Sequence, residues 1–163
     1  MIRAVDTESR ASDRDHLSLR LWLRLLACTN LIEGRARSNL RRTFDTTLPR
    51  FDLMAQLERS PAGLRMNEIS RRMMVTGGNV TRITDQLAEE GLVSRTVEPD
   101  DRRAVTVRLT AAGRRAFAAM AQRHEEWIVD MFAPLSQRER LELYGLLAKL
   151  KAHVARAERS SRR

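Results

Sequence analysis

The sequence predicts a mainly α-helical fold that carries a single two-stranded β-hairpin. Hydrophobic residues make up 42% of the 163 residues, and only seven glycines and four prolines occur among them, which excludes disordered and fibrous chains. Aromatic residues account for 4% and charged residues for 31%, a balance typical of helices with large solvated faces. A chain of this length suffices for one well-buried domain and is short for two.

The first two helices are predicted from apolar spacing and capping residues. Apolar residues recur at helical spacing over residues 16–42, which predicts a long amphipathic helix after a flexible tail at residues 1–15. Thr46 or Thr47 can cap the next helix, because a threonine hydroxyl accepts a hydrogen bond from a backbone N–H of the first turn. Pro49 fits that turn, and the sequence SPAG ends the helix.

A short helix over about residues 66–73 precedes a tight turn and a further helix. Thr76 can cap this further helix, which runs to about Glu90 and stops at Gly91. Three of its apolar residues share one face, Val80, Ile83 and Leu87. Beyond the stop, the spacing alternates in VSRTV and again in VTVRL, which predicts a β-hairpin with EPDD between its strands.

Two more helices complete the chain, over residues 110–132 and 136–157, with Pro134 between them. Ser136 and Glu139 match a capping box, in which each side chain hydrogen-bonds the backbone of the other residue. The last helix carries an apolar seam at 4-3-4 spacing, Leu143, Leu147, Leu150 and Val154.

The order helix, short helix, tight turn, helix and hairpin between Leu48 and Leu109 is that of a winged helix-turn-helix. In that design one helix lies in a DNA major groove, and the hairpin, or wing, reaches along the backbone toward the minor groove. The predicted reading face holds amide, hydroxyl and guanidinium groups that pair with base edges and phosphates. It comprises Thr76, Gly77, Gly78, Asn79, Thr81, Arg82 and Gln86.

The pair Gly77 and Gly78 disfavours a first helical turn by propensity alone. Close approach of backbone N–H groups to a phosphate would explain its presence. The alternative is a flexible surface helix with a weak start.

Four motifs carry a specific resemblance: VTRITDQL in the reading helix, EEGLVSR before the wing, DRRAVTVRLT in its return strand, and TAAG at the next helix. On these motifs the chain resembles the MarR family of bacterial transcriptional regulators. The resemblance implies an obligate homodimer, with a dimerisation region at residues 16–47 and 110–158, a DNA-binding region at residues 48–109, and a basic tail at residues 159–163. It also implies a pseudo-palindromic operator, repression, and release of DNA by a small anionic or phenolic ligand.

The resemblance also implies roles for single residues. Arg103 matches the wing residue inserted in the minor groove, Asp101 matches its orienting partner, and Thr81 and Arg82 match contacts of the reading helix. The Gly77-Gly78 pair stands where many members have bulkier polar residues, so the base preference stays open.

The acids in the hairpin turn, Glu98, Asp100 and Asp101, also suggest a metal or acid/base site. Such a site needs further ligands or a positioned nucleophile, and no His or Cys lies nearby in the sequence. We therefore predict an electrostatic role, in which acids hold Arg102 and Arg103 in shape while the protein is free of DNA.

The chain holds 30 Lys and Arg against 21 Asp and Glu, and this net charge of +9 predicts a polyanionic partner. Residues 61–113 hold eight arginines and seven acids, whereas residues 16–50 hold seven arginines and two acids. The densest part of the surplus, here called the basic segment, comprises Arg35, Arg37, Arg41 and Arg42. Three interpretations of the basic segment stay open. It forms a solvated helix face in which Glu33 pairs with Arg37, it contacts flanking DNA phosphates, or it anchors an anionic effector.

A second resemblance concerns the effector. The runs LWLRLLACTNLIEG and TTLPRFDLMAQLERSPAGLRMNEISRRMMVTGGNVT are similar to a branch of the same family that responds to aromatic acyl-coenzyme A thioesters such as hydroxycinnamoyl-CoA. The resemblance implies a ligand whose phosphates meet the basic segment, while Trp22, Phe51 and Met54 line an apolar slot for its aryl group.

Other functional classes find less support. No nucleophile–base pair or phosphate-binding loop is apparent, so neither catalysis nor a cofactor is expected. One cysteine and three scattered histidines predict no metal site, and His16, His124 and His153 are expected at the surface or at caps. Cys28 is expected to be buried packing, with a redox-sensing thiol and a protein-binding winged-helix adaptor as alternatives. The sequence shows no signal peptide or membrane span, which predicts a cytoplasmic protein.

Overall fold

The computed structural model of the protein describes residues 17–73, 80–98 and 101–161, without the side chains at positions 98, 101–104 and 158–161. The chain divides into two compact units, the first ending at Glu125 and the second beginning at Glu126.

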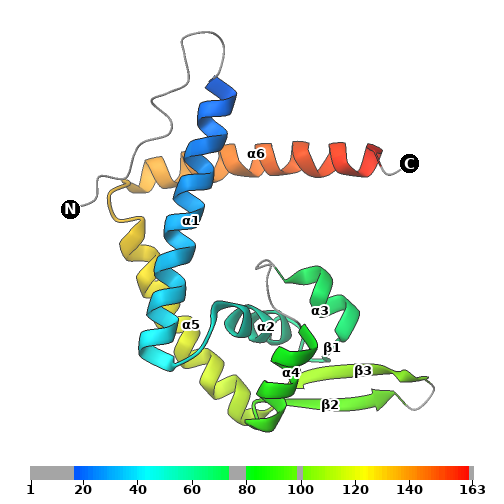
Figure 1. The fold of residues 1–163 in the computed structure, drawn as a ribbon. Coiled ribbons are helices and arrows are strands. Elements are labelled where there is room, and N and C mark those ends of the chain that lie inside the picture. The colour runs from blue at the N-terminus through cyan, green and yellow to red at the C-terminus, as the bar shows by residue number, and fades with distance from the viewer. Residues whose placement is uncertain (1–16, 74–79, 99–100, 162–163) are drawn as a thin grey trace. The chain divides into compact units, whose positions relative to one another are not determined.

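Six helices and three strands make up the described part of the chain, and they are labelled in Figure 1. In chain order they are α1 (Leu17–Phe44), α2 (Leu48–Glu58), β1 (Leu64–Arg65), α3 (Met66–Arg72), α4 (Val80–Glu89), β2 (Val93–Glu98), β3 (Asp101–Leu109), α5 (Ala111–Met131) and α6 (Gln137–Ser161). The predicted fold class, mainly helical with a wing, is confirmed. Within these ranges no helix is both long and apolar enough to cross a membrane.

Side-chain caps begin two helices where the sequence predicts them. The Thr47 hydroxyl accepts a hydrogen bond from the backbone N–H of Arg50 at 3.4 Å, which caps α2. The Glu139 carboxylate accepts from the backbone N–H of Ser136 at 2.8 Å, and the Ser136 hydroxyl accepts from the N–H of Glu139 at 3.3 Å. The hydrogen bonds that Ser136 donates lower the pKa of Glu139, because they favour its charged form.

The wing belongs to a three-stranded antiparallel sheet in the order β1-β3-β2, whereas the sequence predicts a two-stranded hairpin. Strand β1 pairs Leu64 with Val107 and Arg65 with Thr106. Two residues are too few to show an alternating pattern, so periodicity cannot reveal this strand. Gly63 leads into it with a φ of +92°, and a Cβ there would lie 2.6 Å from the Thr106 Cγ2. The turn into β1 therefore requires glycine.

Helix α2 lies at the centre of the first unit, where it contacts α1, α3, α4 and β3. Its side chains Leu53, Met54 and Leu57 are at most 2% exposed. Fully buried residues of the neighbouring elements complete this core, Leu40 of α1, Ile69 of α3, Leu87 of α4 and Val107 of β3. One core therefore joins the second half of α1 to the winged helix.

His124 of α5 departs from the prediction of a surface or capping residue. Its ring packs against Phe51 of α2 with centroids 4.7 Å apart, and Phe117 approaches the same phenylalanine at 5.4 Å. Burial lowers the pKa of His124, because removal from water disfavours the charged imidazolium. A single histidine carries no periodic signal, so the sequence could not distinguish a packed ring from a solvated one.

At the start of α5, Gly113 allows a close approach to the chain that links α4 to β2. The Thr110 hydroxyl caps the helix by accepting a hydrogen bond from the N–H of Gly113 at 3.0 Å. The Leu92 carbonyl accepts from the N–H of Thr110, also at 3.0 Å. A Cβ added to Gly113 would lie only 1.9 Å from that carbonyl oxygen, so any side chain here must displace backbone.

We expect Gly113→Ala to lower the free energy of unfolding by about 1–3 kcal/mol, the usual range for overpacking. Urea unfolding followed by circular dichroism measures the change. Gly34→Ala is the matched control, since nothing lies within 4 Å of a Cβ at this position of α1 and alanine favours a helix interior. Similar effects of the two substitutions would contradict the close approach at Leu92.

Candidate DNA-binding surface

Helix α4 has a buried side and an exposed side. Ile83, Thr84 and Leu87 are buried, whereas Thr81 and Arg82 are exposed. The predicted apolar stripe is confirmed at Ile83 and Leu87, and Thr84 joins it although it is polar. Its hydroxyl donates a hydrogen bond to the Val80 carbonyl at 2.7 Å, which allows burial without water.

The structure describes three of the seven predicted contact residues of the reading helix. Thr81 and Arg82 lie on its exposed side, and Gln86 is half-buried. The other four lie outside the described residues, Thr76, Gly77, Gly78 and Asn79. Their contacts with DNA stay predictions.

The wing projects beyond the helices of the first unit, as Figure 1 shows. Strands β2 and β3 pair from Val93 opposite Leu109 to Glu98 opposite Asp101. This register places the DRR motif next to the hairpin turn. The predicted roles of Asp101, Arg102 and Arg103 depend on side chains outside the described part of the chain.

An ion pair ties the wing to the reading helix. Arg95 of β2 bonds Asp85 of α4 through its Nη1. On the neighbouring strand, the Nε of Arg108 donates to the Ala62 carbonyl at 2.7 Å, which holds β3 to the turn before β1. The first contact holds the base of the wing to α4, and the second holds it to the turn that follows α2.

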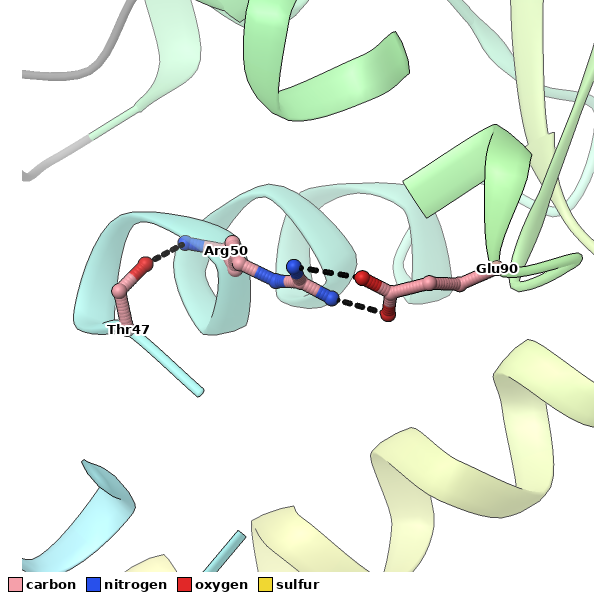
Figure 2. A network of polar contacts seen from close by, with 3 residues as sticks. All are labelled: Thr47, Arg50 and Glu90. Atoms are coloured by element: carbon pink, nitrogen blue, oxygen red, sulfur yellow. Dashed lines mark hydrogen bonds and ion pairs between the residues drawn. The ribbon is translucent and has the colours of Figure 1, made fainter. Parts of the chain in front are cut away.

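A second ion pair joins α2 to the end of α4, as Figure 2 shows. Arg50 donates from Nη1 to the Glu90 Oε1 at 2.8 Å and from Nη2 to the Oε2, so the contact is bidentate. Sequence reasoning missed this pair and that of Arg95 with Asp85, because partners from different elements leave no local pattern. The helix-turn-helix is therefore held by charge as well as by its core.

The basic segment is exposed, and most of its arginines have local partners. Arg37 pairs with Glu33, as one of the three interpretations predicts. Arg41 lies 3.5 Å from the Asp45 carboxylate, and Arg42 donates to the side chain of Asn39 at 2.9 Å. The arginines flank Ala36 and Leu40, whose burial packs this half of α1 against the winged helix-turn-helix, here called the reading head. These pairs agree with a solvated helix face, and they do not test whether the basic segment also contacts DNA phosphates or an effector.

The structure does not bring the three predicted apolar effector residues together within one chain. Phe51 and Met54 are buried, at 9% and 1% exposure, whereas Trp22 is 56% exposed. A rise of ~1.5 Å per residue puts Trp22 roughly 27 Å along α1 from the buried Leu40. The effector slot stays a prediction.

Cys28 is exposed on α1, whereas the sequence predicts a buried packing residue. The face of the helix that carries it is uncovered in a single chain, which a preference for burial cannot anticipate. Among the described residues, no three of His, Cys, Asp and Glu are grouped as metal ligands would be.

Comparison with known proteins places these features in a family. Residues 46–105 match the model of the MarR family. The chain is 26% identical to the HTH-type transcriptional regulator PecS of Dickeya dadantii (strain 3937) over 131 residues, which cover 79% of each chain.

Solved structures agree with this match. A MarR family transcriptional regulator from Silicibacter pomeroyi is 29% identical, with a TM-score of 0.73 over 88% of this chain and 99% of that one. The apo form of MarR from E. coli shares the fold at 23% identity, with a TM-score of 0.69 over 80% of this chain and 96% of that one. Residues 46–105, which include most of the winged helix, therefore match the MarR family, and the chain is similar to transcriptional regulators along most of its length.

Proposed function

We propose that this regulator acts as a homodimer on a pseudo-palindromic operator. The observation that carries the proposal is the apolar row on α6, Leu143, Leu147, Leu150 and Val154, which is 37–50% exposed in a single chain. None of the described side chains of α6 is buried. A helix with an apolar seam and no buried side needs a partner, and a second copy supplies a matching seam by two-fold symmetry.

The first half of α1 supports the same proposal. It exposes several large apolar side chains by 43–69%, Leu17, Leu21, Trp22 and Leu26, and Leu31 follows at 70%. The buried residues of this helix lie in its second half, on the reading head. A two-fold dimer would cover the apolar half and present two reading helices to successive major grooves.

We expect Leu147→Glu to shift the protein from dimer to monomer, because a carboxylate in an apolar seam loses its water without gaining a partner. Sedimentation velocity across a concentration series measures the shift. Lys149→Glu is the control, since it adds a carboxylate to the same exposed helix away from the seam. A dimer that persists in Leu147→Glu would contradict the use of this seam.

We propose that the reading helix and the wing make different kinds of contact with DNA. Thr81, Arg82 and Gln86, with residues 76–79, contact base edges, while Arg102 and Arg103 of the wing, oriented by Asp101, contact the backbone and minor groove. Support comes from the exposure of Thr81 and Arg82 and from the position of the DRR motif beside the hairpin turn. The match to the MarR family favours a DNA partner over the protein-binding adaptor.

Arg103→Ala should weaken binding to the operator and to scrambled DNA of the same composition alike, because it removes a cation from the backbone and from the minor groove, which distinguishes only A·T from G·C pairs. The slope of log K against log salt concentration should flatten by about 0.9 for each phosphate that the variant no longer neutralises. Anisotropy titrations at several salt concentrations measure it, with Arg138→Ala in the exposed first turn of α6 as the control. An unchanged slope in Arg103→Ala would count against the wing assignment.

We propose further that DNA binding represses transcription and that an anionic aromatic ligand, an aryl-CoA thioester or a phenolic acid, releases the DNA. Support comes from the exposed arginines of the basic segment. Phe51 and Met54 belong to the core, so an aryl group reaches them only if α2 shifts. Such a shift would couple the ligand to the reading head, because α2 contacts α4.

An aryl-CoA thioester should bind more tightly than its free acid in calorimetry, because its phosphates meet arginine. Replacing Arg35 and Arg42 by alanine should remove the difference and leave the free acid unaffected. Equal affinities in the wild type would exclude the aryl-CoA class. A double variant that changes only the salt slope of DNA binding would assign the basic segment to DNA phosphates instead.

A further inference from the structure

Arg50 and Glu90 form an ion pair between α2 and the residue that follows α4, and these two helices also contact each other. Arg50 lies in the first turn of α2, and Glu90 directly follows the last residue of α4. Both nitrogens of the guanidinium fork meet the two carboxylate oxygens, as Figure 2 shows. This bidentate geometry fixes the relative orientation of the two side chains as well as their separation, because each carboxylate oxygen has its own donor.

The arginine has little freedom to bind elsewhere. Its side chain is only 17% exposed, whereas that of Glu90 is 47% exposed. Its Nε is buried and has no hydrogen-bond partner within the described ranges. Its backbone N–H is held by the Thr47 hydroxyl at the cap of α2. A guanidinium in this setting is suited to position a neighbouring element and not to reach a DNA phosphate.

The glutamate lies where the reading helix meets the rest of the head. The N–H of Glu90 donates to the Gln86 carbonyl at 3.1 Å, in the last turn of α4. Gly91 then turns the chain with a φ of +70°, and Leu92 provides the carbonyl that Thr110 and Gly113 approach at the start of α5. A shift of Glu90 would therefore tilt α4 relative to α2 and α5.

We propose that the Arg50–Glu90 ion pair positions the reading helix α4, so that it sets the preference for operator over other DNA without contacting DNA itself. The proposal rests on the proposed reading of base edges by α4. Base contacts tolerate small displacements poorly, whereas phosphate attraction depends weakly on the tilt of one helix. Loss of the pair should therefore reduce specific binding and leave non-specific binding nearly unchanged.

The test compares Arg50→Met and Glu90→Gln in the full-length protein. The probes are a duplex that the wild type selects from a randomised pool and a scrambled duplex of the same composition. Both variants should lower the ratio of specific to non-specific affinity by roughly tenfold, the effect of one mismatched base pair, with an unchanged salt slope. The two substitutions change the net charge in opposite directions, so bulk electrostatics predicts opposite effects.

Glu89→Gln is the matched control, because this neighbouring acid is also exposed and the substitution changes the charge equally. It should raise the affinity for both duplexes slightly and keep their ratio. A Glu90→Gln variant that behaves like Glu89→Gln would overturn the proposal. So would an Arg50→Met variant with a flatter salt slope, since that result would make Arg50 itself a phosphate contact.

A charge-reversed pair, Arg50→Glu with Glu90→Arg, keeps the test decisive if the single variants unfold. The double variant should restore a folded thermal transition and most of the wild-type ratio. A double variant that folds without recovering the ratio would overturn positioning by this pair. A wild-type protein that selects no sequence would instead contradict the proposed function, so the two failures are distinguishable.

Discussion

The reading head depends on the burial of α2. This helix contacts α1, α3, α4 and β3, and its residues Leu53, Met54 and Leu57 are almost inaccessible to water. A short helix-turn-helix has too little apolar surface to hold its reading helix in a fixed orientation. The buried helix α2 is the fixed element against which the reading helix is held. Leu40 extends this core into α1, which carries the second half of that helix with the head.

Ion pairs fix the orientation of elements that apolar burial already holds together. Arg50 with Glu90 and Arg95 with Asp85 each join α4 to another element, and both pairs neutralise arginines that would otherwise attract phosphate. Two of the seven acids in residues 61–113, Asp85 and Glu90, are used in these pairs, and the range as a whole holds eight arginines. In the proposed function, Arg102 and Arg103 of the wing contact the backbone and minor groove while α4 reads base edges, which separates attraction to the DNA from base reading.

Helices were predictable from the sequence because caps and periodicity are local signals, as Thr47, Ser136 and Ile83 illustrate. The two-residue strand β1, the packed ring of His124 and the ion pair of Arg50 were not, since each depends on partners from distant parts of the chain. The match of residues 46–105 to the MarR family was predictable because the motifs of that family span the reading helix and the wing. The sequence alone does not distinguish a side chain that lines an effector slot from one that fills the core, as Phe51 illustrates.

Amide hydrogen exchange in the free protein tests most directly whether α2 holds the reading helix. If it does, the amides of α4 around Ile83 to Leu87 exchange with the same opening free energy as those of α2 around Leu53 to Leu57, as one cooperative unit. Conditions that weaken α2 then speed both helices together. Exchange of α4 that is much faster than that of α2, and insensitive to such conditions, would contradict the central role of α2.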